Sequence, residues 1–314
     1  PPLGWAMSVL VVGSLAYDSV ESPEGSIQDA LGGSATYAGL ACQFHLDRLN
    51  RSSASLVGVV GDDFREEDRA TLSDAGLNLT GIQVASGKTF RWEGSYHGSM
   101  AEAVTKATYL NVFEHFKPEV PALLSTPSIV FCANLHPGIQ ASVMDQTSPG
   151  RLTMLDSMNL WIEIAKQDLL KVMHRSDVVI INDGEARMLA GDDNIVRAMT
   201  QLADQTSTAT LVVKRGEHGV IALHNGQWIA LPAYPTADLT DPTGCGDSFA
   251  GSLAAHFSLS EGPVTLDELK QGLAIATVTA SFTLMSFGTE ALCKLTSDRF
   301  EQRLADYTSM IQFS

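Results

Sequence analysis

The sequence of 314 residues has little positive charge, few cysteines and no long apolar segment. Its 20 basic residues are outnumbered by 36 acidic ones, which gives a net charge of −16. A negative field of this kind repels phosphate backbones and anionic membranes, so we expect no nucleic-acid partner and no membrane partner. The cysteines form no CxxC pair and no short secreted framework, which predicts reduced thiols and a cytoplasmic protein. They are Cys42, Cys132, Cys245 and Cys293.

Several common motifs are also missing. Five residues separate Gly81 from Gly87, whereas the P-loop of nucleotide hydrolases requires four between its glycines. No GxGxxG follows the first predicted strand and no HExxH occurs, so neither a dinucleotide nor zinc is expected. The longest uncharged stretch, Gln271–Thr289, contains threonines and serines, and we interpret it as a buried helix. Residues 1–6 do not resemble a signal peptide, and we interpret them as an extension or tag remnant before one domain over residues 7–314.

Short, continuous apolar runs alternate along the chain with segments of helical spacing. Strands that are apolar throughout are typical of sheets covered on both faces, so the pattern predicts an α/β fold with a mainly parallel sheet. The predicted strands are Val9–Val12, Leu56–Val60, Ile129–Cys132, Leu152–Leu155, Val178–Ile181 and Leu211–Val213. The clearest predicted helices are Trp161–His174, Ile195–Gln205, Leu266–Met285 and Asp298–Gln312.

Two stretches break this alternation, roughly 14–33 and 86–114. The first is loop-like, and the second contains Phe90 and Trp92 between polar neighbours, as in a half-exposed strand. We expect both to form a small β-rich lid over the carboxyl ends of the main strands, where open α/β folds bind ligands.

The segment Asp241–Gly251 carries the strongest chemical signal. Pro242 favours an extended Asp241, two glycines allow a tight turn, and the apolar residues that follow lie on one helical face. The backbone N–H groups of Gly244, Cys245 and Gly246 would then form an anion hole at a helix N-terminus, with Asp247 at its edge. The alternative is an ordinary glycine turn in which Asp247 only caps the helix.

Three further motifs join this segment in the order of a known family. They are the diglycine segment Leu31–Ala38, the Asn-x-x-Glu segment Val179–Glu185 and the glycine turn Val213–Gly219. Together they resemble the signatures of the ribokinase/PfkB family of carbohydrate and nucleoside kinases from about Ser8 to Phe300. The resemblance implies a three-layer ribokinase-like core, a β lid over the acceptor, and ATP with Mg²⁺ as cofactors.

The resemblance also implies roles for individual residues on the phosphoryl side. The family's catalytic base maps onto Asp247 and its anion hole onto the turn 244–246. Asn182 and Glu185 would organise Mg²⁺ through water, and the nucleotide would be bound by Asn182, Lys214, Gly216 and Gly219. Without the other motifs, Glu185 would be a solvated strand-end residue and Lys214 a surface charge.

On the acceptor side, the family pattern maps onto Asp18, Gly32, Gly33 and Tyr37. Asp241 and Thr243 lie where some members hold a monovalent cation such as K⁺, and Phe287-Gly288 lies near the second half of that site. The chain departs from the family at Cys245, at Tyr37, which replaces a substrate-binding Asn, and after Asn159, where an Arg is missing. The last two changes remove groups that bind sugars or phosphates and disfavour a phosphorylated acceptor.

The prediction is therefore an ATP-dependent kinase that phosphorylates a hydroxymethyl group of a sugar. A nucleoside acceptor is the alternative, because several aromatic side chains could stack on a base. These are Tyr37, Phe90, Trp92, Tyr96 and Tyr109. They could instead pack the lid or form a lid-to-lid homodimer. A catalytically silent ligand-binding protein of the same fold is the third reading, and retention of Asp247, Asn182 and Glu185 argues against it.

Overall fold

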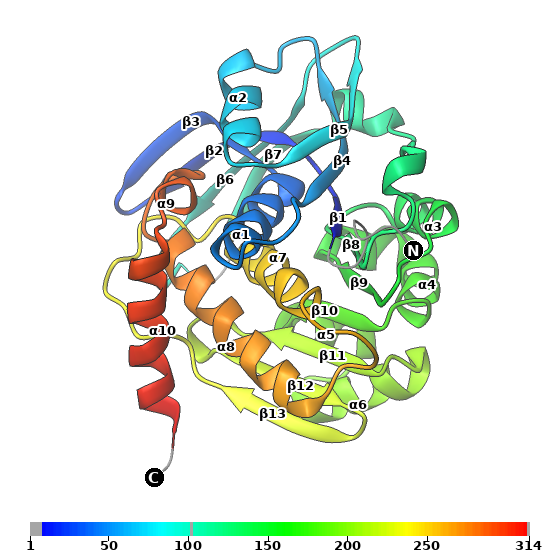
Figure 1. The fold of residues 1–314 in the computed structure, drawn as a ribbon, viewed down its shortest axis with the longest axis vertical. Helices are drawn as coiled ribbons and strands as arrows, with labels where there is room; N and C mark the ends of the chain where they lie inside the picture. The colour runs from blue at the N-terminus through cyan, green and yellow to red at the C-terminus, as the bar shows by residue number, and fades with distance from the viewer. Residues whose placement is uncertain (1–7, 101–102, 313–314) are drawn as a thin grey trace.

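The main sheet has nine strands in the order β13-β12-β11-β10-β9-β8-β1-β4-β5 (Figure 1). The computed structural model describes residues 8–100 and 103–312, so the predicted extension 1–6 lies outside the described residues. The strands are β1 (Val9–Val12), β4 (Ser55–Gly61), β5 (Asn78–Ala85), β8 (Ile129–Cys132), β9 (Leu152–Asp156), β10 (Val178–Asn182), β11 (Thr210–Lys214), β12 (Val220–His224) and β13 (Gln227–Leu231). All pairs from β11 to β5 are parallel, and β12 and β13 form an antiparallel edge.

Helices cover both faces of this sheet, as the continuous apolar strands predicted. The helices are α1 (Ser34–Arg48), α2 (Glu66–Asp74), α3 (Pro137–Gln146), α4 (Asn159–His174), α5 (Asp183–Ala190), α6 (Ile195–Thr206), α7 (Cys245–Phe257), α8 (Leu266–Thr283), α9 (Glu290–Cys293) and α10 (Ser297–Ile311). Alternate residues of β10 belong to different cores: Ile180 packs in the cluster with α1, α7 and α8, whereas Ile181 packs in the cluster with α4, α5 and α6. The three-layer α/β architecture is therefore confirmed.

The apolar segment Gln271–Thr289 lies mainly in α8, which ends at Thr283 and buries most of its apolar residues. Among the described residues, no helix has both the length and the apolar character needed to cross a bilayer.

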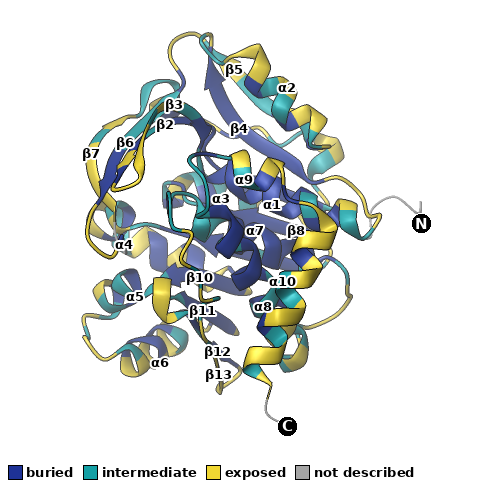
Figure 2. Ribbon diagram, turned by 90° about the vertical axis from the view of Figure 1, so that its left-hand side faces the viewer, coloured by how far each residue is buried: buried dark blue, intermediate teal, exposed yellow. Residues whose placement is uncertain are grey.

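A smaller sheet of four strands, in the order β3-β2-β6-β7, lies against one end of the core. Its strands are β2 (Ala16–Ser22), β3 (Gly25–Gly32), β6 (Phe90–Tyr96) and β7 (Ala103–Tyr109), all within the predicted lid stretches 14–33 and 86–114. Figure 2 shows that β7 exposes most of its length. The opposite face is anchored to the core, where the Ser22 hydroxyl donates to the Thr240 carbonyl at 2.7 Å and the Tyr96 and Thr243 hydroxyls are 3.2 Å apart.

Candidate active site

The glycine turn before α7 has the conformation that the sequence predicted. Gly244 is the N-cap residue with φ 77°, a left-handed conformation that favours glycine. A Cβ on Gly244 would lie 2.3 Å from the ring of Tyr37, so the aromatic ring also requires glycine here. The Cys245 N–H donates to the Pro242 carbonyl at 3.1 Å, so this member of the predicted anion hole already has an acceptor within the turn. Gly246 and Asp247 lie in the first turn, where a helix leaves N–H groups without intrahelical partners.

The Asp247 carboxyl group has an environment suited to a base. Burial, followed by the nearby Asp156 carboxylate, raises its pKa to about 7, while the Lys214 ammonium opposes this rise. A base with a pKa near neutrality is ionised in part at physiological pH and still holds a proton well once it accepts one.

Lys214 is largely covered beside the turn and is not the exposed surface charge that the residue alone would suggest. Its Nζ lies 2.7 Å from Asp156 Oδ2, and the side chain is 18% exposed. A Cβ on Gly246 would lie 3.0 Å from the same Nζ. The ammonium group is therefore next to the helix N-terminus that the sequence predicted for phosphate.

Asn182 and Glu185 interact with each other at the start of α5. The Glu185 oxygens accept from the Asn182 N–H at 2.8 Å and from Asn182 Nδ2 at 2.7 Å, and the Glu185 N–H donates to Asn182 Oδ1 at 2.8 Å. Burial, followed by Asp156, raises the pKa of Glu185 to about 8. Within residues 8–100 and 103–312, no group of three or more His, Cys, Asp or Glu side chains could hold a metal ion. Because both Glu185 carboxylate oxygens already accept hydrogen bonds from Asn182, the group fits Mg²⁺ binding through water and nucleotide phosphates better than direct enclosure of the ion.

On the acceptor side, Asp18 lies against the predicted diglycine. The Gly33 N–H donates to Asp18 Oδ2 at 3.3 Å, and a Cβ on Gly32 would lie 1.9 Å from that oxygen. Asp18 is 5% exposed, and burial raises its pKa to about 7 against the effect of the Gly33 N–H, with Asp241 and Asp247 adding to the rise. The fold thus brings residues more than 200 positions apart in sequence into one acidic cluster.

Tyr37 lies close to this acidic cluster. It is 1% exposed, and its hydroxyl oxygen is buried without a hydrogen-bond partner among the described residues. Burial raises the pKa of Tyr37 well above its usual value, and Asp18, Asp241 and Asp247 all contribute. A buried hydroxyl surrounded by carboxylates is available to a polar ligand.

The predicted cation site is assembled from two loops. Asp241 Oδ1 accepts the Thr243 N–H at 2.9 Å, and Asp241 Oδ2 lies 3.5 Å from the Gly288 N–H. Asp241 is 1% exposed, and burial raises its pKa. The structure therefore brings Gly288 next to Asp241, as the family pattern implied.

The two glycines predicted to bind the nucleotide, both in the loop after β11, have different surroundings. Gly216 is exposed with φ 53°, and nothing lies within 4 Å of where its Cβ would be. Gly219 has φ 82°, and a Cβ there would lie 2.1 Å from the Leu231 carbonyl. Gly219 therefore has a structural reason to be glycine, namely the close approach of the β13 backbone, whereas Gly216 is open to a ligand.

The family model for pfkB family carbohydrate kinases matches residues 7–296. The chain belongs to the pfkB family. A cytidine kinase of Thermococcus kodakarensis is 28% identical over 258 residues, which cover 80% of this chain and 89% of that protein. A fructokinase of Klebsiella pneumoniae is 31% identical over 122 residues, which cover 38% of this chain and 39% of that protein.

Solved structures show the same ribokinase-like fold. A Burkholderia thailandensis nucleoside kinase in complex with inosine has a TM-score of 0.77 at 16% identity, covering 96% of this chain and 98% of that one. A putative ribokinase II from E. coli, in complex with ATP and Mg²⁺, has a TM-score of 0.76 at 16% identity, covering 97% and 100%. As a pfkB kinase, this protein is a phosphotransferase that acts on a hydroxyl group.

Cys245, where this pfkB chain departs from the family, directs its thiol away from the turn. Its Sγ donates to the Ala280 carbonyl of α8 at 3.5 Å, and burial raises the pKa of the thiol. We expect Cys245→Ala to retain kcat within a few-fold, because the thiol contacts α8 and points away from the glycine turn. Steady-state kinetics check this, with Cys293→Ala, which alters an exposed cysteine, as the control. Loss of turnover with unchanged Tm and ATP affinity would show that the thiol takes part.

Glu185 allows a separate test of the metal role. We expect Glu185→Gln to raise the Mg²⁺ concentration needed for half-maximal turnover and to lower kcat, with little change in acceptor KM. A magnesium titration measures this. The substitution also weakens the cap of α5, so Asn194→Ala, which removes the cap of α6, is the matched control for a capping defect. An unchanged titration curve in Glu185→Gln would remove Glu185 from the metal site.

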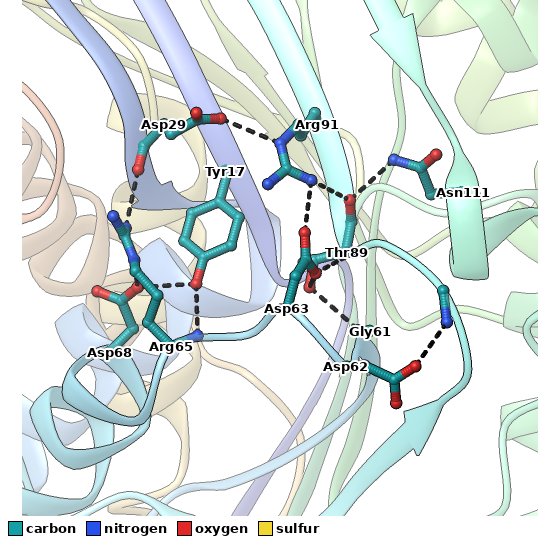
Figure 3. A network of polar contacts seen from close by, with 11 residues as sticks. Tyr17, Asp29, Gly61, Asp62, Asp63, Arg65, Asp68, Thr89, Arg91 and Asn111 are labelled. Atoms are coloured by element: carbon teal, nitrogen blue, oxygen red, sulfur yellow. Dashed lines mark hydrogen bonds and ion pairs between the residues drawn. The ribbon is translucent and has the colours of Figure 1, made fainter.

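A polar network that could not be predicted from the sequence fixes the base of the lid (Figure 3). The Tyr17 ring lies between the guanidinium groups of Arg65, at 4.4 Å, and Arg91, at 5.2 Å. Its hydroxyl donates to Asp68 Oδ2 at 2.9 Å and accepts the Arg65 N–H at 2.8 Å. Because successive strand residues point to opposite faces, anchoring Tyr17 from one side helps to fix Asp18 on the other.

Two ion pairs extend the same network across the lid. Arg91 contacts Asp63 at 2.9 Å and Asp29 at 3.0 Å, so the guanidinium joins β6, β3 and the loop that precedes α2. The members of this network come from three separate parts of the chain, residues 17–29, 63–68 and 91, and no local motif marks it.

Proposed function

We propose that this kinase transfers the γ-phosphoryl group of ATP to a hydroxymethyl group of a furanose ring, with Asp247 as the base. The observation that supports the proposal best is that the carboxyl groups of Asp18 and Asp247 are close enough to influence each other and both have a pKa raised to about 7, beside a glycine turn at a helix N-terminus. Asp18 binds ring hydroxyls and Asp247 receives the hydroxymethyl proton.

In this mechanism the hydroxymethyl oxygen attacks the γ-phosphorus while its proton passes to the Asp247 carboxylate. The new O–P bond forms as the bond to the β-phosphate oxygen breaks, and ADP leaves. The amides at the α7 N-terminus and the Lys214 ammonium stabilise negative charge on the transferring group. Mg²⁺, when bound with the nucleotide, would neutralise phosphate charge that the acidic cluster would otherwise repel.

We propose a nucleoside as the acceptor, because the lid places an aromatic side chain next to Asp18. Trp92 on β6 is the register partner of Asp18 on β2, so both side chains are on the same face of the lid. Trp92 is half-buried, and its indole lies over Gly94, where a Cβ would be 2.1 Å from the ring. The indole N–H bonds Thr105 Oγ1 at 3.2 Å, which fixes the ring plane. A fixed indole beside the sugar-binding carboxylate suits base stacking.

The other aromatic residues are less suited to stacking. Phe90 packs on Phe113 with ring centroids 5.4 Å apart, in a core cluster under the lid. Tyr109 pairs in register with Arg91 and is 49% exposed on the outer face. Tyr96 is buried and bonded to Thr243.

A free sugar is the second candidate, and the directional contacts of Asp18 with the diglycine backbone favour it. One panel separates the two: ADP release with ribose, fructose, cytidine, inosine and adenosine as acceptors. The nucleoside proposal expects turnover on a nucleoside but poor turnover on free ribose. In Trp92→Leu, the KM of that nucleoside rises about ten-fold or more, because a stack contributes roughly 1–3 kcal/mol. Efficient turnover of a free sugar alone would contradict it, and ADP release with none of the acceptors would favour the silent binder.

A monovalent cation at Asp241 and Thr243 belongs to the same proposal. Asp241 offers a buried carboxylate between the loop before α7 and the loop after α8, and a bound K⁺ would lower its raised pKa. Turnover measured with K⁺ against choline as the only monovalent cation checks this site, and equal rates would contradict it.

We also propose that two copies associate through the outer face of the lid. Val104 and Tyr109 on β7 are 56% and 49% exposed on the face opposite Asp18. Sedimentation of the wild-type chain against a Val104→Glu/Tyr109→Glu variant tests the dimer, and a wild-type monomer would contradict it.

The cysteines of the described chain are unpaired, in keeping with the cytoplasm, where ATP is available.

A further inference from the structure

The carboxyl ends of three neighbouring strands meet beside the turn that precedes α7. Asp156 ends β9, Asn182 ends β10 and Lys214 ends β11, and the order β11-β10-β9 in the sheet places Asp156 and Lys214 on either side of β10. Their side chains meet across this strand, with Lys214 Nζ 2.7 Å from Asp156 Oδ2. This is a pairing that no sequence motif contains.

The Asp156 side chain is held firmly enough to fix its partner. It is 4% exposed, and its second oxygen, Oδ1, accepts the Ser157 N–H at 2.8 Å. Gln140 Nε2 donates to the Asp156 carbonyl at 2.9 Å and so fixes the backbone at the same residue. Both carboxylate oxygens therefore have defined donors, and only one of them is Lys214.

Lys214 has a defined partner on one side and the anion hole on the other. Among the described residues, Asp156 is the hydrogen-bond acceptor recorded for Lys214 Nζ, so two of its three N–H donors remain for a ligand. The ammonium is close to Gly246, where a Cβ would be 3.0 Å from it. A flexible four-carbon stem would not hold an ammonium at this point without a fixed counter-ion.

Burial also makes a counter-ion necessary for the charge itself. Burial alone would lower the pKa of Lys214, but Asp156, Glu185 and Asp247 outweigh it and raise that pKa. Asp156 is the only one of the three that bonds the ammonium directly among the described contacts. Removing it would leave a buried charge without its bonded partner.

We propose that Asp156 is a positioning residue that holds the Lys214 ammonium at the α7 turn, where two free N–H donors meet the terminal phosphoryl oxygens of ATP. This inference rests on the proposed function, because it assumes that the terminal phosphate of ATP binds at the α7 turn. Asp156 itself does not touch the reacting atoms and acts only through Lys214.

A double-mutant cycle on kcat tests this dependence. We expect Lys214→Met to lower kcat by about 10²-fold or more and Asp156→Asn to lower it by about ten-fold or more, with acceptor KM changed less than two-fold in both. In the Lys214→Met background, Asp156→Asn should lower kcat no further. If Asp156→Asn reduces kcat as much in that background as in the wild type, or does not reduce it in the wild type, the proposal is wrong.

A second buried ion pair provides the matched control. Arg151 and Glu268 are 2.8 Å apart with side chains 3% and 12% exposed, and they contact the end of α7 far from its N-terminus. Glu268→Gln should lower Tm as a broken buried pair does, while kcat stays within two-fold. If Glu268→Gln lowers kcat as much as Asp156→Asn does, the effect of Asp156→Asn is explained by general destabilisation and the proposal is overturned.

The test remains interpretable if a variant does not fold, and it distinguishes failure of the positioning role from failure of the proposed function. If Asp156→Asn alone does not fold, the double variant lacks both partners and leaves no unpaired charge, so comparing it with Lys214→Met still decides. If the wild-type protein phosphorylates no acceptor, the proposed function fails. If it does and Asp156→Asn keeps full kcat, only the positioning role fails.

Discussion

Replacing Asp247 with asparagine is expected to lower kcat by about 10² to 10⁴, the usual contribution of a positioned base. The amide keeps the shape of the side chain and its place in the first turn of α7 but cannot accept the hydroxymethyl proton. ATP affinity, measured by calorimetry without acceptor, should remain nearly unchanged. A variant with normal turnover on the best acceptor would leave Asp247 as a helix-terminal residue and nothing more.

The same carboxyl group gives that prediction a pH dependence with a definite sign. Asp247 is a base only when it is ionised, so kcat/KM of the wild-type enzyme should rise with pH up to about 7 and then level off. Asp18, with a similar raised pKa, adds to the same acid limb. The limb should therefore lie well above pH 4, where an ordinary aspartate titrates.

As pH rises, the stability of the protein should fall over the range in which its activity rises. A carboxyl group whose pKa is raised on folding stabilises the protein below its unfolded pKa, near 4, and this contribution is lost as pH rises through about 7. At neutral pH the ionised Asp247 is thus a destabilising group that function requires. We expect Asp247→Asn to have a Tm equal to or above that of the wild type at pH 8, and a clear decrease would show that the ionised carboxylate stabilises the turn.

Replacing Asp18 with alanine is expected to lower kcat/KM for the acceptor by about 10² to 10⁴. Two hydrogen bonds from ring hydroxyls to a charged group contribute about 1.5–3 kcal/mol each, and both are lost. KM for ATP should change less than two-fold, because Asp18 lies on the lid strand β2 and not on the nucleotide side. Steady-state kinetics with each substrate varied in turn measure this difference.

A control for lid charge accompanies this variant. Glu24 lies exposed in the turn between β2 and β3, and Glu24→Ala removes the same charge from the same lid without changing the acidic cluster around Asp18. We expect no change in kcat/KM beyond two-fold. If Asp18→Ala behaves like Glu24→Ala, the acceptor is not bound where the structure places it.

The main sheet could be predicted because its buried strands are apolar at almost every position, and this pattern is visible in the sequence of each strand alone. Val178–Ile181 is apolar at every position and lies between helices on both faces, and the other predicted runs behave in the same way. The β12–β13 hairpin was missed although its signal is present. Asn225 and Gly226 have φ of 48° and 79°, as Asn-Gly does in a tight hairpin turn.

The glycine turn at Gly244 could be predicted from local residues, but its surroundings could not. The Cys245 N–H bond to Pro242, the Tyr37 ring against Gly244 and the burial of Lys214 depend on contacts between distant segments. The same holds for Tyr17 and its two arginines, which join β2, β6 and the loop before α2. Side chains that meet only in the folded chain leave no periodic or spaced pattern in the sequence.

The central claim is phosphoryl transfer from ATP to a hydroxymethyl group with Asp247 as base. Phosphorus and proton NMR of the product formed from ATP and the best acceptor of the panel tests it directly. The account predicts a phosphomonoester on the hydroxymethyl oxygen, formed in equal amount to ADP and at least about 10²-fold more slowly by Asp247→Asn. Phosphate on a ring hydroxyl, or inorganic phosphate in place of an ester, would contradict the account.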